Sequence, residues 1–120
     1  MSSLWIFWSV LLLLFGEETS YAFLGQHLVA SYKGCNAAAL TDITMLKQIF
    51  EEAVKASGAT ILSSLSHTFA SDGLTMVFLL SESHASIHTY PEHNACFIDL
   101  FTCGKKCDAA RLNRFAFYCG

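Results

Sequence analysis

The sequence has 120 residues, the size of a single domain. Hydrophobic residues make up 53% of the chain, charged residues 14%, and there is one proline, a composition that excludes a disordered chain. Seven basic residues against ten acidic ones give a net charge of −3. No basic stripe is present to hold phosphates, so nucleic acid is not expected as a partner.

The chain begins with a hydrophobic run, residues 4–15 (LWIFWSVLLLLF), which is interrupted only by Ser9. This run is shorter than the about 20 apolar residues that a transmembrane helix needs. Three interpretations stay open: a peripheral or cleaved extension, a translated segment upstream of the true start, and a secretory signal. Residues 20–22 (SYA) offer the small-x-small site of a signal, but no basic residue precedes the run. We therefore predict an atypical extension over residues 1–22 and a domain over residues 23–120.

The cysteine count bears on the compartment. A full set of disulfides would leave one of the five cysteines unpaired, so free thiols in a reducing compartment are the simpler interpretation. We expect a cytoplasmic protein, with membrane association through residues 1–22 as the alternative. The five are Cys35, Cys96, Cys103, Cys107 and Cys119.

The first two elements are an extended segment, residues 24–33 (LGQHLVASYK), and a helix. Thr41 and Asp42 can cap this helix, and Gly58 supplies its end. Apolar residues recur between them at helical spacing. They are Ile43, Leu46, Ile49, Phe50, Ala53 and Val54.

Four short stretches rich in Ile, Leu, Phe and Thr follow and predict strands. They cover residues 59–69, 74–80, 84–90 and 95–102. Asp72-Gly73 predicts a turn, residues 91–94 (PEHN) separate the last two strands, and Asp108 can cap a final helix. The order β-α-β-β-β-β-α with tight turns predicts an α+β fold, a two-layer α/β sandwich with a mostly antiparallel sheet.

Polar residues concentrate in residues 81–103. In a strand, His84 and His88 would face the same side. They could join Cys103 and Cys107 at a zinc ion, but this spacing is permissive and no CxxC pair exists, so we expect no metal. Plain structural polar residues are the ordinary alternative. A Cys/His hydrolase would also need a pair of oxyanion donors, which nothing in the sequence marks.

This window carries a resemblance to a known family. Residues 82–92 (ESHASIHTYPE) and 101–104 (FTCG) resemble the prokaryotic-type, pyruvoyl-dependent S-adenosylmethionine decarboxylases. The likeness covers about residues 24–108. Further matching segments are residues 24–28 (LGQHL), 34–36 (GCN), 58–62 (GATIL) and 67–69 (HTF).

The resemblance implies that the chain makes its own cofactor. The Glu82–Ser83 bond would cut itself, leaving residues 1–82 as one chain and a pyruvoyl group in place of Ser83 on the other. Attack of Ser83 Oγ on the Glu82 carbonyl gives an ester, so backbone strain and an oxyanion donor must favour it. By the match, His88 acts in this processing. Thr75 takes the place of a processing hydroxyl that is usually serine.

The resemblance also implies a reaction and a substrate. The pyruvoyl group would form a Schiff base with the amine of S-adenosylmethionine, and Cys103 would protonate the α-carbon after decarboxylation. Phe69 would stack on adenine, and Glu92 would bind the ribose hydroxyls. His27 is expected to be structural. The implied enzyme is adenosylmethionine decarboxylase, a carboxy-lyase that supplies the aminopropyl donor for spermidine and other polyamines.

Sites of this family lie between two protomers, so the resemblance implies a homodimer with a four-layer αββα arrangement. A pyruvoyl-dependent arginine or ornithine decarboxylase is one alternative, and retention of Phe69 and Glu92 speaks against it. The second alternative is an unprocessed, non-catalytic homologue. Thr75 and the short C-terminus are the features consistent with it. Only 17 residues follow Cys103, so the closing strand is expected to be missing and a sheet edge to be unpaired.

Overall fold

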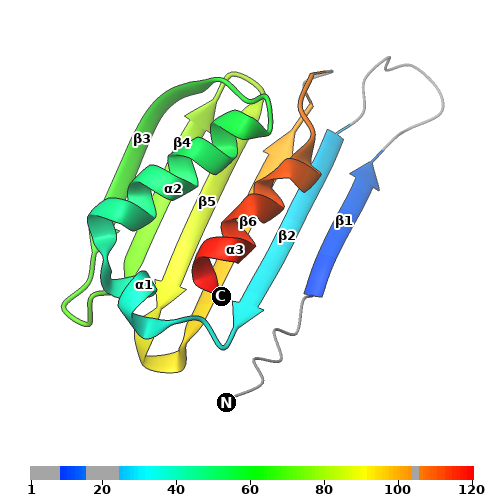
Figure 1. Ribbon diagram of the computed structural model, residues 1–120. Helices are drawn as coiled ribbons and strands as arrows, with labels where there is room; N and C mark the ends of the chain where they lie inside the picture. Colours follow the sequence, from blue (N-terminus) through cyan, green and yellow to red (C-terminus); the bar gives the residue numbers. More distant parts are fainter. Residues whose placement is uncertain (1–8, 16–24, 104–105) are drawn as a thin grey trace.

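The computed structural model describes residues 9–15, 25–103 and 106–120. Six strands form one antiparallel sheet in the order β1-β2-β6-β5-β4-β3 (Figure 1). Their bounds are β1 (Ser9–Phe15), β2 (Gly25–Lys33), β3 (Ile61–Thr68), β4 (Leu74–Leu80), β5 (Ser83–Tyr90) and β6 (Ala95–Thr102).

The helical layer covers one face of this sheet (Figure 1). It consists of α1 (Ala37–Thr41), α2 (Ile43–Ala56), the 3-10 helix η2 (Ala109–Arg114) and α3 (Phe115–Cys119). A second 3-10 turn, η1 (Pro91–His93), joins β5 to β6. The predicted α+β two-layer sandwich is therefore confirmed. No helix in the described part of the chain is long and apolar enough to cross a membrane.

Helix α2 begins and ends where the sequence predicts. The carboxylate of Asp42 accepts a hydrogen bond from the N–H of Met45, at 3.2 Å, which caps the helix. Beyond its end, Gly58 adopts a φ of 92°, and a Cβ there would lie 2.5 Å from the carbonyl oxygen of Lys106. Only glycine fits this position, because both the left-handed backbone and the close approach exclude a side chain.

Side chains on the strands alternate between a helix-covered face and an open face. Along β4, Leu74 and Phe78 are buried under the helices, whereas Val77 and Leu79 lie on the opposite face and are exposed. The ring of Phe50 in α2 stacks on Phe78 with centroids 5.5 Å apart. The core thus lies between α2 and the sheet, and the open face carries the remaining side chains.

The N-terminal run contains a strand that the sequence did not predict. Ser9–Phe15 forms β1, which pairs along β2 from Ser9 opposite Ser31 to Phe15 opposite Gly25. The sequence alone does not assign the expected unpaired sheet edge to a strand. β1 pairs with the outer side of β2, so the end strands of the described sheet are β1 and β3. The predicted signal-like site at residues 20–22 lies outside the described residues, and the boundary after residue 22 stays a prediction.

Two helical details also differ from the sequence-based expectation. Helix α1 was not predicted; the Asn36 side chain caps it by accepting from the N–H of Ala38 at 2.9 Å. The final helix starts as a 3-10 turn after Asp108, whose carboxylate accepts from the N–H of Ala110 at 3.1 Å. Short helices of this kind follow from local capping rather than from apolar periodicity, so periodicity does not reveal them.

Candidate active site

Glu82 and Ser83 lie at the tight turn that joins β4 to β5. Ser83 has a φ of 156°, a region in which residues with side chains are rarely found and which costs about 1–3 kcal/mol. The carboxylate of Glu82 accepts a hydrogen bond from the N–H of Thr60 at 3.0 Å. Burial alone would raise the pKa of Glu82, but hydrogen bonds from Thr60 and Ser81 outweigh burial and lower this pKa.

Cys103 follows the last residue of β6 and reaches this turn. Its backbone N–H and its thiol both donate to the carbonyl oxygen of Glu82, at 3.4 and 3.3 Å. Ser83 pairs with Thr102 in the sheet, which fixes Cys103 beside the Glu82–Ser83 peptide bond. Two donors on one carbonyl oxygen can stabilise negative charge if that carbonyl is attacked.

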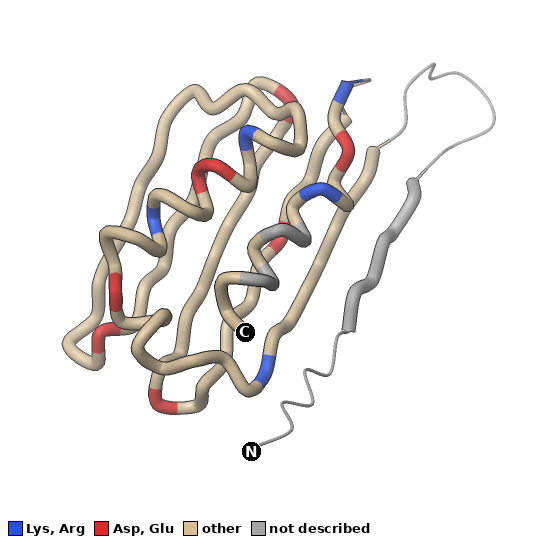
Figure 2. Tube along the Cα trace, in the orientation of Figure 1, with Lys and Arg blue, Asp and Glu red and all other residues tan. Residues whose placement is uncertain are grey.

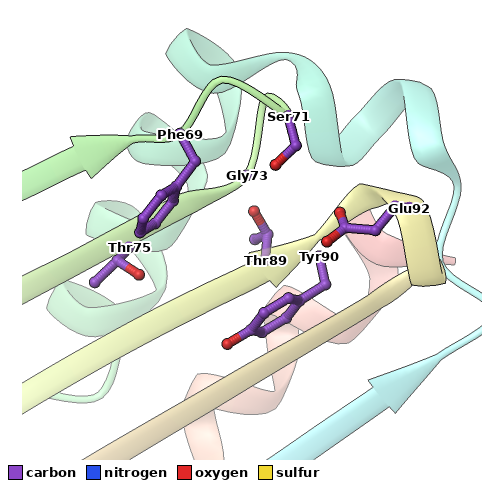
Figure 3. A pocket seen from close by; sticks show the side chains of 7 residues that line it. All are labelled: Phe69, Ser71, Gly73, Thr75, Thr89, Tyr90 and Glu92. Carbon is purple, nitrogen blue, oxygen red and sulfur yellow. The ribbon is translucent and has the colours of Figure 1, made fainter.

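Phe69 and Glu92 belong to a second group, which surrounds a pocket of about 340 Å³ (Figure 3). Phe69 comes from the loop after β3 and Glu92 from η1, and the two side chains stand at different sides of the cavity. The volume falls within the range of small-molecule sites. The lining residues are Phe69, Ser71, Gly73, Thr75, Thr89, Tyr90 and Glu92.

Thr75 and His88 join the pocket group rather than the turn of Ser83. They face each other on β4 and β5, and Thr75 Oγ1 lies 3.1 Å from His88 Nδ1. Thr75 also lines the pocket. The two predicted processing residues therefore form one hydrogen-bonded pair.

The predicted site residues form two groups at opposite ends of the sheet. The strand β5 starts at Ser83 and ends at Tyr90 beside the pocket. At about 3.3 Å per residue, Ser83 lies about 17 Å from His88 and about 23 Å from Tyr90. One chain thus brings Glu82, Ser83 and Cys103 together, but it does not bring them to the pocket group.

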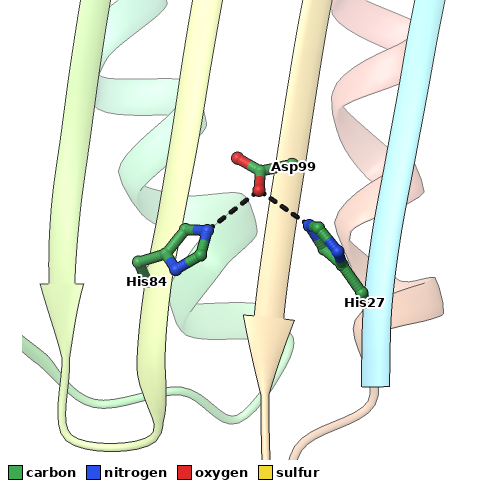
Figure 4. Close-up of side chains that lie close together, drawn as sticks. All are labelled: His27, His84 and Asp99. Carbon is green, nitrogen blue, oxygen red and sulfur yellow. Dashed lines mark hydrogen bonds and ion pairs between the residues drawn. The ribbon is translucent and has the colours of Figure 1, made fainter. Parts of the chain in front are cut away.

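A third cluster escaped the sequence analysis: His27, His84 and Asp99 meet on neighbouring strands β2, β5 and β6 (Figure 4). The Nε2 atoms of both histidines lie 2.9 Å from Asp99 Oδ2. Burial would raise the pKa of Asp99, but hydrogen bonds from Ser86 and the two histidines lower it. Alternation along β5 and β6 could have suggested the cluster, had the pairing of these strands been known.

The histidine-cysteine zinc group that the spacing allowed is not found in the described part of the chain. His84 instead bonds to Asp99, and His88 bonds to Thr75. Cys107 is buried, whereas Cys103 is exposed. The Cys35 and Cys119 thiols are buried. The hydrogen bond with Cys119, together with burial, raises the pKa of Cys35. At Cys119 the hydrogen bond with Cys35 lowers the pKa, but the hydrogen bond with Cys96 and burial outweigh it and raise the pKa, so both thiols suit a packing role.

Charged residues avoid most of the sheet. In Figure 2 they lie mainly on the helices and turns, while the strands are largely uncharged. Apolar side chains are exposed instead, many of them on the open face. The exposed large hydrophobic residues among those described are Val29, Met45, Leu62, Leu65, Phe69, Val77, Leu79, Tyr90 and Phe97.

Comparison with known proteins places the chain in a family. The family model for S-adenosylmethionine decarboxylase matches residues 26–117. The S-adenosylmethionine decarboxylase proenzyme of Thermotoga maritima is 44% identical over 85 residues, which are 71% of this chain and 65% of the relative. Proenzyme 2 of Halalkalibacterium halodurans is 38% identical over 85 residues, 71% of this chain and 67% of the relative.

A solved structure agrees with this match. The crystal structure of the adenosylmethionine decarboxylase from Aquifex aeolicus aligns with a TM-score of 0.66 and 36% identity, over 80% of this chain and 77% of that one. The match to the Thermotoga relatives spans about 65% of their length. The sequence match and the fold support the same assignment. The chain belongs to the S-adenosylmethionine decarboxylase family.

Proposed function

We propose that this chain is the proenzyme of a pyruvoyl-dependent S-adenosylmethionine decarboxylase that cuts its own Glu82–Ser83 bond. The observation that carries the proposal is the pair of donors from Cys103 on the carbonyl oxygen of Glu82, beside a serine of unusual φ. Its product would be decarboxylated S-adenosylmethionine, the aminopropyl donor for spermidine synthesis.

Self-cleavage requires only groups of the protein itself, from one copy or two, and water. Ser83 Oγ attacks the carbonyl carbon of Glu82, and the C–N bond breaks. The hydroxyl proton ends on the released nitrogen, so that an ester and a free amine of Ser83 replace the amide. The two donors of Cys103 hold the negative charge that develops on the Glu82 oxygen. Loss of the Ser83 Cα proton then breaks the Cβ–O bond and releases the Glu82 carboxylate. Addition of water to the remaining dehydroalanine, through its imine tautomer, gives ammonia and the pyruvoyl group at position 83.

The residues around Ser83 fit such a group. When formed, the pyruvoyl group supplies an electron sink for the carboxylate's electron pair. Cys103 lies next to position 83 and carries an exposed thiol, whose S–H is a proton donor. We assign it the delivery of the proton to the substrate α-carbon.

The pocket supports recognition of the adenosyl group. The ring of Phe69 is half-exposed and can stack on a purine, and the Glu92 carboxylate can accept two hydrogen bonds from the ribose diol. The hydrogen bond between Thr75 and His88 supports a joint role of this pair in processing.

A homodimer would join the two groups. The open face exposes Val29, Val77, Leu79 and Phe97, and the strands carry few charged residues (Figure 2), which suits burial against a second sheet. A two-fold axis between the sheets and perpendicular to the strands would lay the Ser83 end of one chain on the pocket end of the other. Each of the two sites of this four-layer αββα dimer would then draw on both chains.

Intact mass under denaturing conditions tests the cleavage. We expect two chains, residues 1–82 and 83–120, the shorter with a ketone in place of its N-terminal amine. The Ser83→Ala variant should stay whole. A wild-type chain that remains intact after long incubation refutes the proposal and supports an unprocessed homologue.

Release of labelled carbon dioxide tests the substrate. The cleaved protein should release it from carboxyl-labelled S-adenosylmethionine and not from arginine or ornithine. The Glu92→Gln variant should raise KM for S-adenosylmethionine, because an amide accepts fewer hydrogen bonds from a diol. Release from arginine or ornithine instead would establish the alternative substrate class.

A further inference from the structure

The cluster of His27, His84 and Asp99 has no part in the cleavage or decarboxylation described above. It draws one residue from each of β2, β5 and β6, and all three lie on the sheet face opposite the helices (Figure 4). We propose that these three residues form a binding site for a divalent transition-metal ion, Zn²⁺. The proposal does not depend on the decarboxylase function, and it replaces the sequence-based expectation of no metal.

The donor set is the first reason. Two imidazole nitrogens and one carboxylate oxygen are the protein ligands of His₂-carboxylate zinc sites, in which a water takes the fourth position. Here the candidate ligand atoms are His27 Nε2, His84 Nε2 and Asp99 Oδ2. Two histidines with one carboxylate exclude the hard-ion alternatives Ca²⁺ and Mg²⁺, which favour oxygen ligands.

The distances are the second reason. Both Nε2 atoms lie 2.9 Å from Asp99 Oδ2, and the three atoms all lie within 4.8 Å of one another. In a tetrahedral site with bonds of 2.0–2.1 Å, ligand atoms stand about 3.3 Å apart. Each of the two N–O distances therefore has to lengthen by about half an ångström to admit an ion, and the two Nε2 atoms, which lie within 4.8 Å of one another, can reach the same ion after a small rotation of the rings.

The surroundings orient the ligands, as the partners of metal ligands do in known sites. The hydroxyl of Ser86 donates to Asp99 Oδ1 and leaves Oδ2 to face the histidines. The ring of Phe101 lies against both imidazoles, with centroids 5.6 Å from His27 and 6.1 Å from His84. The exposed side-chain fractions are 27% for His27, 43% for His84 and 23% for Asp99, so an ion can reach the cluster in a single chain.

The position of the site suggests its role. His84 is the second residue after the proposed cleavage point, whereas His27 belongs to residues 1–82. An ion shared by His27, His84 and Asp99 would tie the new end of the shorter chain to β2 and β6 after cleavage. It would thus fix the residue next to position 83.

Cobalt titration tests the site without reference to activity. The full chain is stripped with EDTA and titrated with Co²⁺, whose visible d–d bands report four-coordinate binding. We expect one Co²⁺ per chain, displaced by one Zn²⁺. The variants His84→Gln, His27→Gln and Asp99→Asn should each weaken binding more than about 100-fold, and Ser86→Ala about 10- to 100-fold.

Two controls isolate the site. His93→Gln removes an exposed histidine outside the cluster and should bind as the wild type does. Cys103→Ser should also retain the d–d bands of bound Co²⁺. Loss of these bands in Cys103→Ser would show that the thiol binds the ion and would overturn the proposal. Circular dichroism establishes that each variant is folded. Absence of binding by the folded wild type, or binding that persists in both His84→Gln and Asp99→Asn, refutes the site.

Discussion

The thiol of Cys103 lies 3.3 Å from the carbonyl oxygen of Glu82, and the backbone N–H of Cys103 approaches the same oxygen at 3.4 Å. The two residues are 21 positions apart in sequence. The pairing of Ser83 with Thr102 holds them together at the end of the sheet. In the proposed function, one side chain thus serves the self-cleavage first and the decarboxylation afterwards.

Substitution of Cys103 separates these two uses. Cys103→Ala removes the thiol donor but keeps the backbone N–H, so we expect self-cleavage to slow about 10- to 100-fold. This loss is smaller than the one that follows removal of an amide donor from an oxyanion hole, because a thiol is a weaker donor. Cys103→Ser retains a hydroxyl donor and should cleave faster than Cys103→Ala. The rate is measured from intact mass against time. Cleavage of Cys103→Ala at the wild-type rate contradicts the assigned role.

The distance between Ser83 and His88 predicts processing across the dimer. A His88→Ala chain should cleave slowly alone, but co-expression with Ser83→Ala should restore its cleavage, because the uncleavable partner supplies His88. Tags of different mass identify the chains. Co-expression with the double variant Ser83→Ala/His88→Ala is the matched control and should restore nothing. If both co-expressions leave the His88→Ala chain intact, His88 does not act from the second copy.

The turn before β4 predicts an effect on the pocket. A Cβ at Gly73 would lie 2.9 Å from the backbone oxygen of Thr89, so Gly73→Ala must displace the pocket wall. We expect a loss of about 1–3 kcal/mol in the free energy of unfolding and a higher KM for S-adenosylmethionine. Urea unfolding and steady-state kinetics measure the two. Ser71→Ala, which adds no atoms to the same pocket, is the control, and an equal effect there would argue against the steric cause.

The lowered pKa of Asp99 predicts a pH-dependent part of the stability. The stabilisation is fully present above the ordinary aspartate pKa of about 3.9, and it is lost as the pH falls through the lower pKa of the folded protein. Wild type should therefore exceed Asp99→Asn in the free energy of unfolding at pH 6, and the difference should narrow below about pH 4. Urea unfolding at several pH values measures it. A difference that does not vary with pH would show that Asp99 stabilises by packing alone.

Much of the fold could be predicted because the relevant signals are local. The helix after Asp42 and the strands at residues 74–80 and 95–102 have the predicted bounds or nearly so, since apolar periodicity and capping groups lie within the segments themselves. The strand Ser9–Phe15 was missed. Its apolar run shows neither the alternation of a strand nor the spacing of a helix. Only its backbone pairing with β2 in the folded chain identifies it as a strand.

The sequence by itself determined the family, through residues 82–92 and 101–104, and with it the candidate site residues. Only the tertiary structure decided how these residues are distributed. It joins Cys103 to Glu82, separates both from Phe69 and Glu92, and gathers His27, His84 and Asp99. The physical reason is the extended strand: it carries neighbours in sequence far apart, while hydrogen-bonded pairing brings distant residues within contact.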